Sequence, residues 1–182
     1  MKQKCVPEDW KKGVIIPVFK KGDKKVCDNY RGITLISQIA KVLERILERR
    51  MRRKVEEELQ EEQYGFRSGR STVDPIFSMR QLMEKNWEYG KDLVMTFIDL
   101  EKAYDSVPRE KVWETLVKKR LGREMIEMVQ AMYNNCVSRV STPVGKTEWF
   151  KNKTGLRQGS VLSPLLFIMV MDEIVKKHVD AC

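Results

Sequence analysis

The fold depends on residues 96–105, which read TFIDLEKAYD. Residues 93–98 form a short run of apolar and β-branched side chains, typical of a strand buried on both faces. Asp99 follows at the end of this run, and the aromatic Tyr104 comes five positions later. An aspartate that ends a buried strand faces a cleft with little freedom to move, which suits a metal ligand. Aspartate is also favoured there for backbone reasons, at a strand end or turn, so this stretch alone leaves both hypotheses open.

Length and composition favour one compact domain with a sizeable core. The chain has 182 residues, a hydrophobic fraction of 42% and a net charge of +9. Residues 1–54 hold 16 basic and 6 acidic side chains, whereas the remainder holds 19 and 20. All the excess positive charge therefore lies in the first third. This favours a polyanionic partner such as nucleic acid or a triphosphate, or else a solvated basic face.

The cysteine and histidine content excludes two kinds of site. The four cysteines form no Cys-x-x-Cys pair and His178 is the single histidine, so neither a Cys/His zinc set nor an ordinary histidine-based triad is expected. This usage fits a reducing intracellular compartment, cytoplasmic or nuclear. We expect no signal peptide and no membrane, because the longest apolar stretch, residues 165–171, is too short to span a bilayer. The cysteines are Cys5, Cys27, Cys136 and Cys182.

A basic hairpin is predicted near the N-terminus. Residues 14–19 are apolar and predict a strand, which Pro17 marks as an edge strand. A polar turn follows, and residues 30–36 return as a second extended segment carrying Arg31. The tip of this hairpin would hold Lys20, Lys21, Lys24 and Lys25.

A long amphipathic helix is expected after Ser37, which can cap it. Its basic face favours solvation over nucleic-acid contact. Further helices are expected over residues 73–88, from Pro108 to about 121, and over 123–134, and strands over 137–141 and 147–151. The apolar stripe of the first helix would comprise Ile39, Val42, Leu43, Ile46, Leu47, Met51 and Val55.

Two loops have a composition that is typical of binding sites. Residues 63–72 combine two glycines, two arginines and two aromatic rings, which suits approach to a phosphodiester chain, although a simple connector is equally consistent. Residues 155–160 form a polar loop that leads into a buried helix, with Ser163 as its cap and Pro164 in its first turn.

Taken together and in this order, these motifs resemble the successive blocks of a reverse transcriptase, closest to the kind encoded by non-LTR (LINE-type) retrotransposons. The resemblance covers roughly residues 10–175. It implies an α+β right-hand polymerase fold, helix-rich, with a basic finger hairpin and a small antiparallel palm sheet. The chain would be a single partial domain, fingers-like over about 1–92 and palm-like over about 93–182. The motifs are KKGD (20–23), NYRGI (29–33), YGFR (64–67), FID (97–99), AYD (103–105), GLRQGS (155–160) and SPLLF (163–167).

The resemblance also implies roles for single residues. Asp99 matches the first palm aspartate, which bridges two Mg²⁺ ions, and the carbonyl of Leu100 would be a weaker ligand. Tyr104 matches the aromatic that excludes a 2′-hydroxyl by its volume, while Asp105 is expected to cap the following helix. The implied partners are an RNA template, a DNA primer and deoxynucleoside triphosphates. Arg31 with Lys20 or Lys21 would neutralise the triphosphate, Gln158 and Gly159 would line the nucleotide pocket, and Phe66 and Arg67 would lie near the template.

The chain departs from the family pattern at one block. Reverse transcriptases carry an aromatic-x-Asp-Asp hairpin after the buried helix, and no Asp-Asp pair occurs in this sequence. The thumb is lacking too. An incomplete Mg²⁺ site is therefore expected, with the edge of the 93–98 strand and the helix from Pro164 partly uncovered.

Three hypotheses about function remain open at this point. In the first, the chain is a fragment of an active RNA-directed DNA polymerase and is inactive alone. Otherwise it is a remnant that binds nucleic acid without catalysis, or a decayed copy with no function. Neither the clade nor the oligomeric state follows from the sequence.

Overall fold

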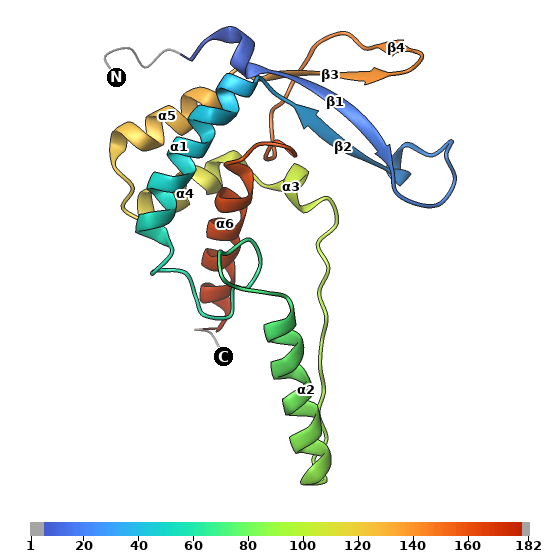
Figure 1. Cartoon of the computed structure of the whole chain (residues 1–182), viewed down its shortest axis with the longest axis vertical. Coiled ribbons are helices and arrows are strands. Elements are labelled where there is room, and N and C mark those ends of the chain that lie inside the picture. The colour runs from blue at the N-terminus through green and yellow to red at the C-terminus, as the bar shows by residue number, and fades with distance from the viewer. Residues whose placement is uncertain (1–5, 180–182) are drawn as a thin grey trace.

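A helical body, a sheet along one side of it and a long projecting arm make up the molecule (Figure 1). This computed structural model describes residues 6–179, and both Cys5 and Cys182 lie outside them. No helix in that range is long and apolar enough to cross a bilayer.

The sheet is built on the predicted finger hairpin, which is confirmed. β1 (Lys12–Phe19) and β2 (Tyr30–Leu35) pair antiparallel, and β3 (Val137–Thr142) lies parallel on the other side of β1. The pairing of β3 reaches only residues 12–15 of β1. Pro17 therefore stands where β1 has a free edge, and its missing N–H costs no ladder hydrogen bond. β4 (Gly145–Lys146) and β5 (Phe150–Lys151) both pair antiparallel with β3.

Four helices enclose the core, and the predicted helices match them closely. Pro108 is the N-cap of α4, and Gly122 separates α4 from α5 as the sequence indicates. The most deeply buried apolar side chains include Met51, Leu116 and Leu165, one from each of three helices. The core helices are α1 (Gln38–Val55), α4 (Arg109–Lys118), α5 (Arg123–Tyr133) and α6 (Ser163–Val179).

The first long helix buries a different face from the one that its apolar pattern predicts. Ile39 and Val42 are 64% and 61% exposed, whereas Glu44 and Glu48 are buried. The predicted stripe is therefore wrong in its first half. The reason is that carboxylates can enter a core when donors there satisfy them, and Glu44 meets such donors.

A small antiparallel sheet does form in the second half of the described chain, from β3, β4 and β5, but the prediction of a buried strand over residues 93–98 is wrong. Val94 and Ile98 are 90% and 83% exposed, and no strand lies in this segment. Residues 92–100 make no backbone hydrogen bond to another described residue. The β-branched composition favours a strand, but a strand needs a neighbour for its N–H and C=O groups. None of the described strands lies beside this segment.

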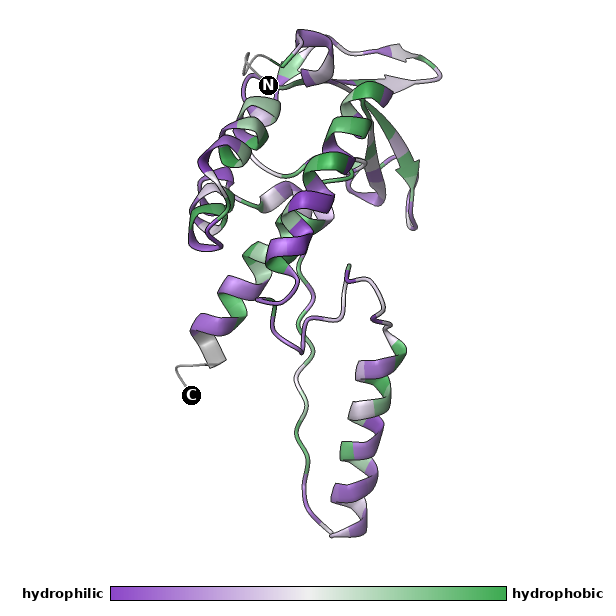
Figure 2. Cartoon of the chain, turned by 60° about the vertical axis from the view of Figure 1, so that its left-hand side comes forward, coloured by the Kyte–Doolittle hydropathy of each residue, from purple (hydrophilic) through white to green (hydrophobic). Residues whose placement is uncertain are grey.

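We call residues 73–100 the arm. It comprises α2 (Val73–Glu88) and the extended segment that runs back beside it in both views (Figures 1 and 2). α2 has no buried residue, and Phe77 and Trp87 are among its exposed side chains. Figure 2 shows apolar residues along both α2 and the extended segment beside it, with no other element covering them. Residues 93–98 are thus uncovered, but as an extended segment and not as the edge of the strand that the sequence predicts.

The exposed arm predicts self-association of the isolated chain, because an extended apolar segment with unpaired backbone groups can pair with another copy of itself. Replacing Val94 and Ile98 with lysine is expected to raise the concentration at which association begins by about tenfold, equivalent to ~1.4 kcal/mol. Size-exclusion chromatography with light scattering over a range of concentrations measures this. Val144→Lys is the matched control, because Val144 is exposed on the β3–β4 turn, away from the arm. A wild-type chain that stays monomeric throughout would contradict the prediction.

Candidate nucleotide site

Five of the predicted site residues line one cavity of about 470 Å³, which we call the Gln158 cavity. They come from segments far apart in the sequence. β2 contributes one, the loop after α1 another, α3 (Ala103–Ser106) a third, and the loop before α6 the last two. These residues are Arg31, Phe66, Tyr104, Gln158 and Gly159.

Gln158 is the point at which three of these segments meet. Its Oε1 accepts a hydrogen bond from Arg31 Nε at 3.1 Å, and its Nε2 donates to Asp105 Oδ2 at 2.9 Å. Its backbone carbonyl accepts from the Thr34 N–H at 2.6 Å. The side chain and backbone of one residue thus connect β2, α3 and the loop.

Asp105 does not cap the following helix, contrary to expectation. Pro108 occupies the N-cap position of α4, and no side chain caps that helix. The Asp105 carboxylate turns instead to the amide of Gln158. The distance along the chain between these two residues hides this contact from local sequence patterns.

Gly159 is required by the close approach of two backbones. Its φ is +117°, and a Cβ at this position would lie 2.4 Å from the carbonyl oxygen of Thr34. No L side chain fits there without moving the backbone. The sequence predicts a glycine for close approach to a ligand, and in the structure the approach is to β2.

The Tyr104 ring is held between two other aromatic rings. It stacks on Phe167 of α6 with centroids 4.8 Å apart and an interplanar angle of 15°. Phe66 meets it edge-on at 6.3 Å. Burial raises the pKa of the Tyr104 hydroxyl, against the opposing charge of Arg31, so the phenol stays neutral at physiological pH. Stacking fixes the ring where its volume can exclude a ligand group.

Behind the loop lies a buried ion pair that the sequence reasoning missed. Glu44 Oε1 accepts from Arg157 Nη2 at 3.3 Å, and its Oε2 accepts from Ser160 Oγ at 2.9 Å and from the Val161 N–H at 2.8 Å. Both charged side chains are nearly inaccessible to solvent. One carboxylate thus anchors the loop to α1.

Arg157 extends the same network toward the sheet and α5. Its Nη1 donates to the Trp10 carbonyl at 3.2 Å, and its guanidinium lies over the Tyr133 ring at 5.1 Å. A signal for Glu44 does exist in the sequence. Glu44 occupies the helical register of Ala40 and Leu47, which are both buried.

The remaining predicted residues do not line the Gln158 cavity. Lys20 and Lys21 are exposed at the tip of the hairpin. Asp99 is exposed on the arm. Arg67 is buried within its own loop, where its Nε donates to Glu56 Oε1 at 2.8 Å and its Nη1 donates to the Gln60 carbonyl at 2.8 Å.

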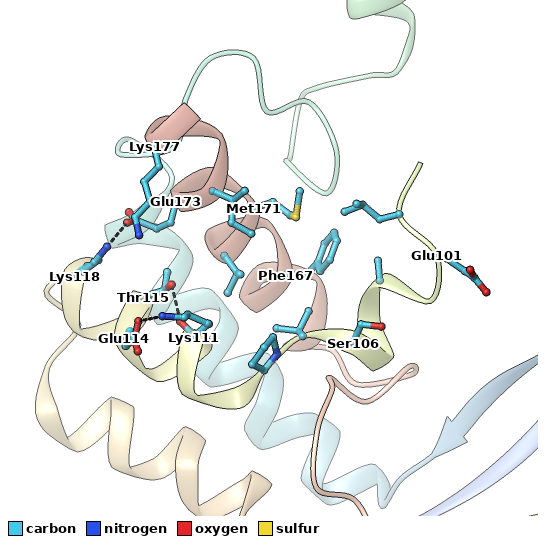
Figure 3. Close-up of a pocket in the computed structure, with 16 residues that line it drawn as sticks. Glu101, Ser106, Lys111, Glu114, Thr115, Lys118, Phe167, Met171, Glu173 and Lys177 are labelled. Carbon is cyan, nitrogen blue, oxygen red and sulfur yellow. Dashed lines mark hydrogen bonds and ion pairs between the residues drawn. The ribbon is translucent and has the colours of Figure 1, made fainter. Parts of the chain in front are cut away.

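Leu100 lines a second cavity of about 460 Å³, which we call the Phe167 cavity (Figure 3). Its wall is mostly apolar, with Phe167 and Met171 of α6 directed into it. The ion pair between Lys118 and Glu173, with 3.0 Å between Nζ and Oε2, stands at one edge. Because Tyr104 lines the Gln158 cavity and stacks on Phe167, the aromatic pair separates the two cavities. One face of α6 is thus partly uncovered, as the sequence predicts.

The Asp172 side chain is bound by other groups in the body of the protein. Its carboxylate accepts from the Gln60 N–H at 2.9 Å and from the ammonium groups of Lys119 and Lys176, both at 2.8 Å. Burial by itself raises the pKa of Asp172, but these donors together hold it below its ordinary value. Within residues 6–179, no three Asp, Glu, His or Cys side chains gather to hold a metal.

A family model described as reverse transcriptase (RNA-dependent DNA polymerase) matches residues 18–181. The chain belongs to the reverse transcriptase family. The resemblance predicted from the motifs is confirmed, including its non-LTR type. The chain is 36% identical over 87 residues to a Pol polyprotein from the retrotransposable element R2 of Nasonia vitripennis, a match that covers 48% of this chain and 8% of that protein.

Other relatives match nearly all of this reverse transcriptase chain. The transposon TX1 149 kDa protein of Xenopus laevis is 25% identical over 167 residues, covering 92% of this chain and 13% of that protein. A putative protein of element R1DM from Drosophila melanogaster is 27% identical over 179 residues, covering 97% and 17%. The chain thus spans less than a fifth of the length of each of these three relatives.

A solved structure shows that the fold is shared. A telomerase from Candida tropicalis, solved in complex with a fragment of telomeric RNA, superposes with a TM-score of 0.63 at 15% identity. The match covers 96% of this chain and 33% of that one. The right-hand polymerase fold predicted for the reverse transcriptase chain is confirmed at this level. The division into fingers and palm near residue 92 stays a prediction.

The Glu44 anchor predicts a large stability effect in this reverse transcriptase chain. Glu44→Ala leaves Arg157 buried and unpaired, so the free energy of unfolding should fall by roughly 3–5 kcal/mol. Urea denaturation followed by circular dichroism measures it. Glu114→Gln is the control, because Glu114 forms an exposed pair with Lys111, 2.8 Å between Nζ and Oε2, and exposed pairs contribute at most about 1 kcal/mol. Equal losses in the two variants would show that burial of the Glu44 pair does not matter.

Proposed function

We propose that this chain forms the fingers and part of the palm of an RNA-directed DNA polymerase from a non-LTR retrotransposon. The enzyme would extend a DNA primer on an RNA template with deoxynucleoside triphosphates. The observation that carries the proposal is the convergence in one cavity of residues from four separate motifs, namely Arg31, Phe66, Tyr104 and Gln158 with Gly159.

The Gln158 cavity has the chemistry that an incoming nucleotide needs. Arg31 supplies a guanidinium that neutralises the triphosphate as charge develops on it, and Lys20 and Lys21 add positive charge at the hairpin tip. Tyr104, fixed by its stacking on Phe167, excludes a 2′-hydroxyl by its volume and so selects deoxynucleotides. Gln158 and the adjacent glycine form the wall against which the nucleotide lies.

The template would run past the loop that follows α1. Phe66 lines the Gln158 cavity and is about half exposed, so its ring is free to stack on a template base. Arg67 serves this contact from within the loop, because its guanidinium binds Glu56 and the carbonyls of Gln60 and Gln63 in the chain before Phe66. Lys41 lines the same cavity and adds positive charge toward the template backbone.

Reverse transcriptases use divalent metal ions, and we propose Mg²⁺ with Asp99 as one ligand and the Leu100 carbonyl as another. Mg²⁺ takes carboxylate and carbonyl oxygens, so both donors are of the right kind. Two ions, however, need several carboxylates, and no such cluster exists within residues 6–179. The residues described here do not by themselves fit the two-ion site.

The 182-residue chain alone is expected to give no product in primer extension on an RNA template with Mg²⁺. The reason is that Asp99 has no partner carboxylates within the residues described. Gel separation of labelled primers measures it, with a complete reverse transcriptase as positive control. Product that disappears in Asp99→Ala would contradict this prediction and show that these residues suffice.

The coding sequence after residue 182 tests the polymerase proposal directly. A reading frame that continues into an aromatic-x-Asp-Asp block supports it. The longer polypeptide should then extend primers, and Asp99→Asn should abolish extension while leaving nucleotide binding in place. An authentic stop codon directly after Cys182 would rule out the fragment hypothesis.

Nucleic-acid binding without catalysis is the second candidate, and a copy without any function is the third. The charge distribution favours the second, because the excess positive charge lies in the first 54 residues and Lys20, Lys21, Lys24 and Lys25 are all exposed. Binding by these groups predicts that log Kd for single-stranded RNA rises with log salt at about 0.7 per phosphate contact. Fluorescence anisotropy at several salt concentrations measures the slope.

The two sets of variants for the binding test remove the same number of positive charges from different elements. Neutralising Lys20, Lys21 and Arg31 together should lower the salt slope by about 2. Neutralising Lys111 and Lys118 of α4 together with Lys146 of β4 should leave it nearly unchanged. Affinity that is independent of salt, or that survives the first set of substitutions, would contradict the binding candidate and favour the copy without function.

A further inference from the structure

We propose that Asp105 is a positioning residue of the Gln158 cavity: its carboxylate fixes the side-chain amide of Gln158, which in turn holds Arg31. The inference deepens the proposed nucleotide site and rests on that function. It concerns a residue whose sequence context indicates only a structural role at a helix start.

The contacts of Gln158 leave its amide one orientation. A glutamine amide has an acceptor oxygen at one end and a donor nitrogen at the other, with nearly the same shape. Arg31 Nε can only donate and lies 3.1 Å from Oε1, while the Asp105 carboxylate can only accept and lies 2.9 Å from Nε2. A flipped amide would set donor against donor and acceptor against acceptor. The two neighbours therefore select one orientation between them.

Backbone hydrogen bonds fix the two segments that carry this contact. The Leu156 N–H donates to the Tyr104 carbonyl at 2.7 Å, and the Gly155 N–H donates to the Val107 carbonyl at 3.0 Å. At Gly155, φ is +79° and a Cβ would lie 2.7 Å from the carbonyl oxygen of Asp105. The loop and α3 are thus packed backbone to backbone. The backbone of Asp105 therefore cannot move away from the loop unless these contacts break, which keeps its carboxylate within reach of the amide of Gln158.

Asp105 acts on the Gln158 cavity only through Gln158. It does not line the Gln158 cavity but a neighbouring polar cavity of about 540 Å³, and Gln158 lines both. A nucleotide in the Gln158 cavity would therefore touch Gln158 and Arg31 but not Asp105. This separates a positioning role from a catalytic one. The amide keeps one N–H and one lone pair free, in directions that the other two residues fix before the nucleotide arrives.

Loss of the carboxylate should release the amide and, through it, the guanidinium. In Asp105→Ala the amide of Gln158 has no acceptor at its nitrogen and can rotate, so Arg31 loses an oriented partner. Asp105→Asn keeps an acceptor oxygen at the same place and should retain the geometry. Because Asp105 is exposed, neither change should unfold the chain.

The first test uses the 182-residue chain without nucleotide. The side-chain NH₂ signals of Gln158 are assigned in ¹H–¹⁵N spectra by their absence in Gln158→Glu. We expect Asp105→Ala to move these signals to the positions of a free glutamine amide, and Asp105→Asn to keep them near the wild-type positions. Glu101→Ala, which removes an exposed carboxylate that lines only the Phe167 cavity, is the matched control. Signals unchanged in Asp105→Ala would overturn the proposal.

The second test adds a deoxynucleoside triphosphate with Mg²⁺ and follows the backbone signals of Arg31 and Gly159. Asp105→Ala should raise the Kd about three- to tenfold, the effect of one lost hydrogen bond, and Asp105→Asn should stay within about threefold of wild type. Equal affinity of wild type and Asp105→Ala would overturn the role of Asp105 alone. No binding to the wild-type chain would overturn the proposed nucleotide site, and the amide signals would still decide whether Asp105 positions Gln158.

Discussion

The buried pair between Glu44 and Arg157 is the constraint on which the candidate site depends. Removal of a carboxylate and a guanidinium from water costs several kcal/mol each, and the mutual attraction offsets this cost only with good geometry and additional hydrogen bonds. Here the partners come from the loop itself, from the Trp10 carbonyl and from the Tyr133 ring. The network forms only when α1, α5, the segment before β1 and the loop sit together, and Arg157 Nε has no hydrogen-bond partner within it. The loop that carries Gln158 is therefore fixed by the body, not by a ligand.

The arm differs from this network, because the described part of the chain provides no neighbouring strand for a segment with the composition of a strand. Residues 93–98 have the composition of a strand, yet their backbone groups have no described partner. The uncovered apolar surface is continuous in the chain, because the arm leads through Leu100 directly into the Phe167 cavity.

The motifs predicted a nucleotide site that includes Arg31, Tyr104, Gln158 and Gly159, with Phe66 near the template, and these five residues line one cavity. The other predicted site residues, Lys20, Lys21, Arg67, Asp99 and Leu100, do not line it. Local periodicity predicted the helices well, but in the first half of α1 it placed the exposed Ile39 and Val42 in the core, whereas Leu47, Met51 and Val55 are buried as predicted. Apolar counting cannot place Glu44 inside, because the donors that make its burial tolerable lie more than a hundred residues along the chain. The prediction of a strand over residues 93–98 was wrong for a related reason, because the composition of a segment does not show whether a neighbouring strand is present to pair with it.

Nucleotide binding and chemistry thus depend on different parts of the molecule. The groups that would hold the nucleotide sit on the body, where the Glu44 network and the backbone contacts at Gly155 and Gly159 fix them. Asp99 sits on the extended segment of the arm, where residues 92–100 make no backbone hydrogen bond to another described residue. Under the proposed function, the binding wall forms before any metal ligand is in place. The position of Asp99 relative to the nucleotide then depends on whatever strand pairs with the arm, so pairing of the arm is the step that would join binding to catalysis.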